Sequence, residues 1–159
     1  MENKEQIFTE LLREHKSTIY SVCFMYAESA EEADDLFSEV AIRLWQGLES
    51  FEHRSSTSTW IWRVSLNTCI SCNRKTKRHN APKLTMNRNL YEDTDEDSRQ
   101  IQMLYSRINR LKPFDRAIVL LWLDNLSYDE IAAIVGISVK NVSVRLVRIK
   151  EELKRMSNN

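Results

Sequence analysis

Residues 126–146 constrain this chain most, because they carry the pattern of a helix, a tight turn and a second helix. Ser127 followed three residues later by Glu130 is a capping box, which predicts that the first helix begins there. Gly136 comes where that helix must end, and glycine adopts without strain the left-handed conformation that often ends a helix. Ser138 predicts the N-cap of the second helix. These signals together predict a helix-turn-helix, the motif that places its second helix in the major groove of DNA.

The second helix of this pattern has one apolar side and one polar, basic side. Its apolar residues recur four, three and four positions apart and predict a buried stripe. The members of this stripe are Val142, Leu146, Ile149 and Leu153. The polar side carries Lys140, Asn141, Ser143, Arg145 and Arg148. Asparagine and arginine can form paired hydrogen bonds with base edges, and lysine and arginine neutralise phosphates. The alternative is an ordinary helical hairpin whose basic side is solvated.

The composition favours an all-α protein made of one domain or two small ones. Among 159 residues only 2 are glycine and 2 are proline, fewer turn residues than a sheet-rich fold needs, whereas 42% are apolar, enough to form a core. No stretch reaches transmembrane length, and the first residues, Met-Glu-Asn-Lys-Glu, do not resemble a signal peptide. We therefore expect a soluble, cytoplasmic protein.

The formal net charge of zero hides a strong segregation of charge along the chain. Residues 1–50 hold 4 basic and 11 acidic residues, whereas residues 51–90 hold 8 basic and 1 acidic. Residues 91–98 hold 5 acidic residues and no basic one, and residues 99–159 hold 11 basic and 6 acidic. Two basic blocks separated by an acidic segment predict two nucleic-acid contacts on one chain.

Periodicity predicts two amphipathic helices before the first basic block. The first covers residues 5–27. The second begins at Ser29 or Ala30, carries acidic residues in its first turn, as the helix dipole favours, and ends near Leu48. Several charged residues of the second helix lie off its apolar stripe, and a solvated helix surface is the simplest explanation for them.

A third helix, about 59–77, combines tryptophans with a basic end and is predicted to be capped by Thr57 or Ser58. The residues predicted to face inward are Trp60, Ile61, Val64 and Thr68. Aromatic residues interleaved with basic ones suit a single nucleic-acid strand, whose bases stack on aromatic rings. Buried tryptophans beside a basic helix end are an equally good explanation.

Residues 79–98 lack periodicity and carry the acidic run, which predicts a flexible acidic linker between two folded units. A helix over about 98–110 follows, and Pro113 begins another that leads into the helix-turn-helix.

Three cysteines lie in helix-like sequence, and two of them, Cys69 and Cys72, form a Cys-x-x-Cys motif with His53 and His79 nearby. Structural zinc usually needs a second close pair of ligands, which the sequence lacks. Buried, reduced cysteines are the more common outcome, so no metal and no cofactor are expected.

Three segments carry a resemblance to a known family. They are Asp35 to Val40 with Leu44-Trp45 and Phe51, Ser58 to Val64 with Asn67 and the basic residues after it, and Leu111-Lys112-Pro113 with residues 126–146. In this order they resemble the small sigma factors of the extracytoplasmic-function (ECF) group of the sigma-70 family, over roughly residues 5–155. These are the promoter-recognition subunits of bacterial RNA polymerase.

The resemblance implies two small helical domains and a division of labour between them. Residues 1–78 would bind core polymerase and recognise and melt the minus-10 element, residues 79–98 would be the linker, and residues 99–159 would read the minus-35 element. The implied core-binding residues are Asp35, Leu36, Glu39, Arg43, Leu44, Trp45 and Phe51. The implied minus-10 residues are Ser55, Ser56, Ser58, Trp60, Arg63, Asn67, Arg74, Lys75, Lys77 and Arg78. The implied minus-35 residues are Ser138, Lys140, Asn141, Ser143, Val144, Arg145 and Arg148.

The resemblance also implies partners: core RNA polymerase, promoter DNA and an anti-sigma factor, with a free chain that is monomeric and not an enzyme. Two other readings stay open from the residues alone. An autonomous helix-turn-helix regulator would bind an operator as a dimer, but it leaves the acidic helix and the tryptophan-rich helix unexplained. A zinc-dependent nuclease would need a cluster of catalytic residues, which the sequence does not display.

Overall fold

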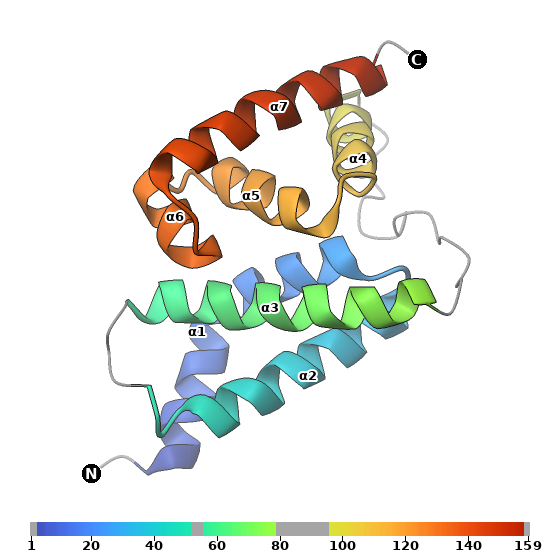
Figure 1. The fold of residues 1–159 in the computed structure, drawn as a ribbon. Helices are drawn as coiled ribbons and strands as arrows, with labels where there is room; N and C mark the ends of the chain where they lie inside the picture. The colour runs from blue at the N-terminus through green and yellow to red at the C-terminus, as the bar shows by residue number, and fades with distance from the viewer. Residues whose placement is uncertain (1–2, 52–55, 79–95, 158–159) are drawn as a thin grey trace. The chain divides into compact units, whose positions relative to one another are not determined.

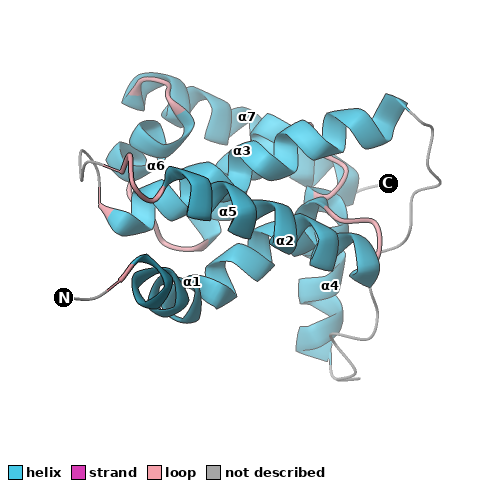
Figure 2. Cartoon of the chain, turned by 90° about the horizontal axis from the view of Figure 1, so that it is seen from below, coloured by secondary structure: helices cyan, strands magenta, loops and turns pink. Residues whose placement is uncertain are grey.

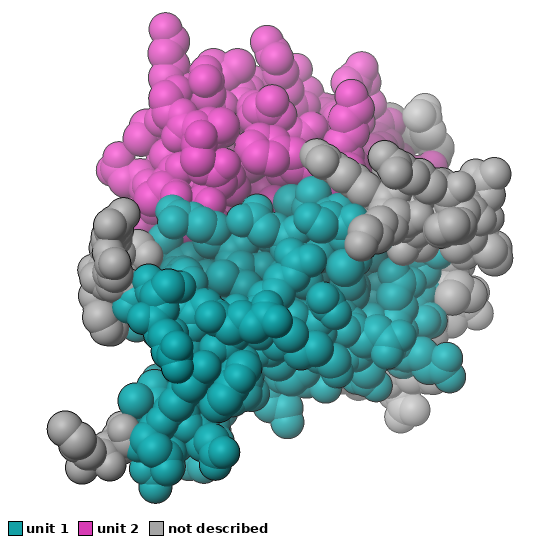
Figure 3. All heavy atoms as spheres, turned by 60° about the horizontal axis from the view of Figure 1, so that its bottom comes forward, with its two compact units in different colours: residues 1–81 teal, residues 82–159 magenta. Residues whose placement is uncertain are grey.

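The computed structural model describes residues 3–51, 56–78 and 96–157, and it describes side chains over 3–51, 56–72 and 99–156. Every regular element in these ranges is a helix (Figure 2). The chain forms two compact units, which we call unit 1 (residues 1–81) and unit 2 (residues 82–159) (Figure 3). Among the helices of the described ranges, none combines the length and the apolar character needed to cross a membrane. The expected all-α class is confirmed.

Within its described residues, unit 1 contains three helices that all pack against one another: α1 (Lys4–Tyr26), α2 (Ala30–Gly47) and α3 (Thr57–Arg78) (Figure 1). Asn3 begins α1 with a capping box, and Ser29 begins α2 by accepting a hydrogen bond from the backbone N–H of Glu32. All three helices contribute to one buried core. Its members include Ile19, Val22, Cys23, Leu36, Val40, Leu44, Ile61, Trp62, Leu66 and Cys69.

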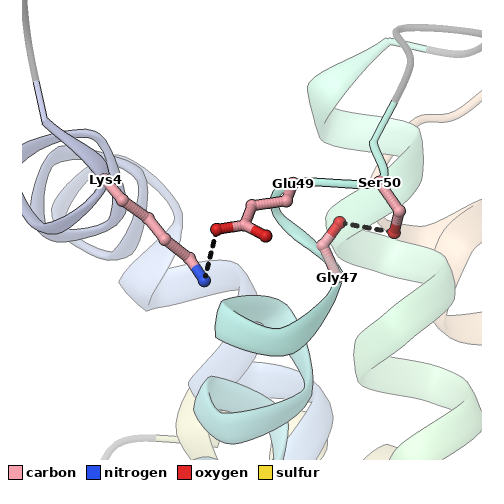
Figure 4. Close-up of polar contacts among 4 residues, drawn as sticks. All are labelled: Lys4, Gly47, Glu49 and Ser50. Atoms are coloured by element: carbon pink, nitrogen blue, oxygen red, sulfur yellow. Dashed lines mark hydrogen bonds and ion pairs between the residues drawn. The ribbon is translucent and has the colours of Figure 1, made fainter.

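The turn after α2 is held against the start of α1 (Figure 4). Lys4 Nζ lies 3.4 Å from Glu49 Oε1, and the Ser50 hydroxyl donates a hydrogen bond to the Gly47 carbonyl over 3.1 Å. The same ammonium lies 4.0 Å from the centre of the Trp45 ring. An exposed ion pair contributes little by itself, but the aromatic contact helps to fix this end of the unit.

The described part of unit 2 contains four helices: α4 (Glu96–Ile108), α5 (Pro113–Leu123), α6 (Tyr128–Val135) and α7 (Val139–Ser157) (Figure 1). Helix α7 contacts each of the other three. The turn between α4 and α5 is closed by Arg116, which is only 4% exposed. Its Nη2 donates to the carbonyls of Asn109 (2.8 Å) and Leu111 (3.1 Å). Charged donors make strong hydrogen bonds, so this buried guanidinium fixes the entry to α5.

The structure corrects three local predictions. The N-cap of α3 is Ser56, whose Oγ accepts from the Thr59 N–H over 3.1 Å, so it precedes the predicted cap. Helix α4 begins at Glu96, inside the predicted linker, and residues 79–95 lie outside the described residues. On α3, the predicted Ile61 and Thr68 are buried, whereas Trp60 and Val64 are only half-buried.

The buried side of α3 is broader than a single stripe. Trp62, Ser65 and Leu66 are buried although none was predicted to face inward, and Cys69 is buried as expected of a reduced cysteine. Helix α3 packs against both α1 and α2, and a helix between two neighbours must bury two adjacent stripes.

Candidate functional site

The helix-turn-helix forms from the local signals that predicted it. Ser127 and Glu130 make a reciprocal capping box at the start of α6. Gly136 ends α6 with a φ of 79°, a left-handed conformation that favours glycine. The Ser138 hydroxyl accepts a hydrogen bond from the Asn141 N–H over 3.1 Å at the start of α7. The capping box therefore fixes the start of α6, and Gly136 together with the Ser138 cap fixes the turn from α6 into α7.

Helix α7 separates its buried and exposed sides as predicted. Val142 and Leu146 are 0% exposed and Ile149 is 1% exposed, whereas Leu153, at the end of the stripe, is only half-buried. Of the predicted minus-35 residues, those that are exposed are Ser138, Lys140, Asn141, Val144, Arg145 and Arg148, and Ser143 is half-buried. The arrangement offers amide, hydroxyl and guanidinium groups on one continuous helical surface, the kind of surface that reads base edges.

The Arg145 side chain contacts two other residues of unit 2. Its Nη1 lies 3.0 Å from Asp115 Oδ1, and its guanidinium carbon lies 4.8 Å from the centre of the Phe114 ring. Both partners belong to the first turn of α5, and sequence analysis missed them. Only the fold brings positions 30 residues apart together.

The described part of the predicted minus-10 surface consists of the first half of α3 with Ser56 before it and Phe51, which contacts it. The Trp60 ring stacks on Phe51, with ring centres 4.5 Å apart and planes 15° from parallel. Arg63 and Asn67 are exposed on the helix that follows, as is Ser58 in its first turn. Trp60 is thus a half-buried aromatic platform beside polar groups that can reach a nucleic-acid strand.

Among the other predicted minus-10 residues, one caps a helix and the rest lie outside the described residues or side chains. Ser56 uses its Oγ as the N-cap of α3, and its hydroxyl also donates to Thr59 Oγ1 over 2.9 Å. Its first role is therefore structural. Ser55 and the side chains of Arg74, Lys75, Lys77 and Arg78 lie outside the described residues and side chains.

The predicted core-binding segment on α2 divides into an exposed and a buried set. Asp35 is exposed, and Glu39 and Arg43 form an i, i+4 pair with 3.9 Å between Oε1 and Nε. Leu36 is only 4% exposed and Leu44 is 0% exposed, so both belong to the core of unit 1. Neither side chain is therefore open to a partner while unit 1 is folded, and their part in core binding stays a prediction. An apolar residue on an amphipathic helix usually packs inside its own domain.

The two aromatic residues of that segment also make contacts within the unit. Trp45 is half-buried and packs edge-on against Phe8, with ring centres 5.2 Å apart and planes 77° apart. Phe51 is half-buried beneath Trp60. Both therefore first shape the ends of α2 and α3, and only their remaining exposed edges can meet a partner.

Two of the three cysteines, Cys23 and Cys69, are free thiols in the core, and Cys72 is half-buried. Cys23 Sγ and Cys69 Sγ lie 3.9 Å apart between α1 and α3, and both side chains are 0% exposed. The hydrogen bond with Cys23, followed by burial, raises the pKa of Cys69 far above its ordinary value. Throughout the described ranges, no group of three or more His, Cys, Asp and Glu side chains is arranged to hold a metal ion.

Comparison with known proteins matches both units. The family model for sigma-70 region 2 matches residues 11–79, and the model for sigma-70 region 4 matches residues 101–153. The chain is 30% identical to the ECF RNA polymerase sigma factor SigW of Bacillus subtilis (strain 168), over 95% of this chain and 89% of SigW. It is 27% identical to the RNA polymerase sigma factor YlaC of the same organism, over 98% of this chain and 94% of YlaC.

Solved structures share the fold at low sequence identity. The sigma factor RpoE, in complex with the anti-sigma factor NepR from Bartonella quintana, matches with a TM-score of 0.77 and 19% identity, over 95% of this chain and 96% of RpoE. CnrH, in complex with the cytosolic domain of CnrY, matches with a TM-score of 0.70 and 19% identity, over 97% of this chain and 89% of CnrH.

Proposed function

The chain belongs to the ECF RNA polymerase sigma factors of the sigma-70 family, and we propose that it directs bacterial core RNA polymerase to promoters and starts transcription there. The observation that carries this proposal is the presence of sigma-70 region 2 and region 4 on one chain, in that order and on separate compact units. The chain supplies recognition in the cytoplasm, and the polymerase supplies the chemistry of RNA synthesis.

We propose that α7 reads the minus-35 element from the major groove. Its exposed side presents Asn141 and Arg145, which can form paired hydrogen bonds to bases, and Lys140 and Arg148, which suit phosphates. The exposed Val144 can contact the methyl group of a thymine. The capped turn before α7 supports this role, because it holds the start of the recognition helix rigidly.

We propose that the turn before α3 and the first half of α3 hold an unpaired base of the minus-10 element. Flipping a base costs a few kcal/mol of stacking, which a preformed pocket and aromatic stacking can offset. The Trp60–Phe51 stack supplies a rigid aromatic wall, and Asn67 and Arg63 supply polar groups beside it. The basic end of α3, Arg74 to Arg78, would follow the phosphates.

We propose that the exposed charges of α2 form the docking surface for core polymerase, on a coiled coil of its largest subunit. Asp35, Glu39 and Arg43 are on the surface, while Leu36 and Leu44 hold the helix in place from inside. An anti-sigma protein is the expected regulator of the free chain, since the structural relative RpoE is solved with one.

The test is transcription in vitro with core polymerase on genomic fragments, with start sites mapped. Defined start sites that require the chain support the proposal. An autonomous dimeric regulator predicts a different result: the chain would elute as a dimer in gel filtration and bind an operator tightly without polymerase. Failure to direct polymerase to any start site, together with that dimeric binding, would overturn the proposal.

A further inference from the structure

Asp115 holds a guanidinium that unit 2 presents to the outside. Asp115 Oδ1 lies 3.0 Å from Arg145 Nη1, and the guanidinium carbon lies 4.8 Å from the Phe114 ring centre. The Arg145 side chain remains 45% exposed, whereas that of Asp115 is 20% exposed. The carboxylate is thus a mostly covered support beneath a reachable cation. This differs from an exposed surface pair, in which both side chains are free to move.

The two contacts restrict the guanidinium in different ways. The carboxylate takes a hydrogen bond from one nitrogen, and the aromatic ring lies against the guanidinium. A guanidinium has five N–H donors in a rigid plane, so donors remain for another partner after one has formed the hydrogen bond with Asp115. A side chain already held in position loses less conformational freedom when that partner binds.

An arginine that no neighbouring side chain holds in place binds DNA phosphates more readily than it binds a base. Phosphates are charged, numerous and recognised without regard to sequence, so a mobile guanidinium adds affinity but little specificity. A carboxylate next to Arg145 counters this in two ways: it restrains the side chain, and its own negative charge repels phosphates.

We propose that Asp115 is a positioning residue for promoter recognition: it commits Arg145 to one base pair of the minus-35 element and keeps it from DNA phosphates. The proposal rests on the function proposed above and adds to it a residue outside the helix-turn-helix. Asp115 acts through Arg145 and does not itself touch a base.

The experiment uses full-length Asp115→Asn in holoenzyme, on a promoter mapped with the wild-type chain. Affinity is measured for that promoter and for variants with each minus-35 base pair changed. A mismatched base pair costs the wild type roughly 5- to 150-fold in affinity. We expect Asp115→Asn to lose at least threefold of this discrimination at one base pair only. We expect its log affinity to fall more steeply with log salt, by about 0.9 in slope, because Arg145 gains a phosphate contact.

Two variants separate positioning from simple loss of charge or structure. Asp124→Asn removes the same charge from an exposed site just after α5, and we expect it to leave discrimination unchanged. In the double variant Asp115→Asn with Arg145→Ala, discrimination should equal that of Arg145→Ala alone, because Asp115 acts only through Arg145. Additive losses in the double variant overturn the proposal.

A second route remains decisive if Asp115→Asn unfolds unit 2. Arg145→Lys leaves α5 intact and keeps the charge but loses the planar fork, and it should lose discrimination at the same base pair. If Asp115→Asn or Arg145→Lys discriminates between base pairs as well as the wild type at every minus-35 position, the inference is wrong. A wild-type chain that fails to start transcription sinks the proposed function instead, so the two failures are distinguishable.

Discussion

Replacing Leu44 by alanine separates the two roles that α2 combines. Leu44 is 0% exposed in the core of unit 1, so the substitution should leave a cavity and lower the free energy of unfolding by about 2–5 kcal/mol. Ile42, two residues earlier on the same helix, is 50% exposed, and Ile42→Ala should cost less than about 1 kcal/mol because the environment of its side chain changes little.

The assay is urea unfolding followed by tryptophan fluorescence in a Trp122→Phe background. Trp122 is the one tryptophan of residues 82–159, so its removal leaves a signal from unit 1 alone. For small domains the free energy falls by about 1–3 kcal/mol per molar urea, so a loss of about 3 kcal/mol moves the midpoint by about 1–3 M. Ile42→Ala in the same background is the matched control.

Binding of the Leu44→Ala variant to core polymerase decides whether Leu44 belongs to the core or to the docking surface. Under conditions where Leu44→Ala is still folded by circular dichroism, it should bind core polymerase as the parent does. Asp35→Arg with Glu39→Arg should behave in the opposite way and lose pull-down of core polymerase with its helical signal intact. An unchanged urea midpoint for Leu44→Ala, combined with lost binding, would refute the reasoning.

Three other outcomes are expected. Arg145→Ala should weaken discrimination at one minus-35 base pair by roughly 1–3 kcal/mol in a binding titration, and an unchanged promoter preference would contradict a base-reading role. Gly136→Ala should destabilise unit 2 by about 1–2 kcal/mol in thermal unfolding, because the added methyl group meets no atom within 4 Å and only its φ of 79° is strained; an unchanged melting temperature would show that the turn relaxes. Native Cys23 and Cys69 should resist iodoacetamide at pH 8 and react after denaturation, because burial and the raised pKa of Cys69 disfavour the thiolate. Rapid labelling of either, measured by mass spectrometry, would place them outside the core.

The sequence predicts best where the structural signal is local. The caps at Ser127 and Ser138 and the left-handed Gly136 act within three or four residues, so the helix-turn-helix could be read directly from the letters. The buried side of α3 was harder to predict from the sequence, because its breadth depends on the packing of α3 against two neighbouring helices. Trp62 was not among the residues predicted to face inward, but it is 6% exposed in the core.

The candidate site shows the same limit. The residue types on α7 were predicted correctly as exposed, but the contact between Arg145 and Asp115 joins helices that periodicity treats separately. Leu36 and Leu44 are buried in the core although the resemblance places them in a partner-binding segment, because such a segment also contains residues that fold its own domain. A motif identifies a segment, and only packing identifies which of its side chains can be reached.

The two proposed DNA-reading surfaces explain why such a chain would depend on polymerase. Each surface is small: a few exposed groups on α7, and one aromatic platform with its polar neighbours on α3. A surface of that size gives modest affinity by itself, because association costs must be met before any surplus appears. Two weak contacts become strong when they are held together, because the second then forms at a high effective concentration. Core polymerase bound to α2 would hold both surfaces to one promoter, so the separation of docking charges from DNA-reading groups follows from the way affinity is assembled.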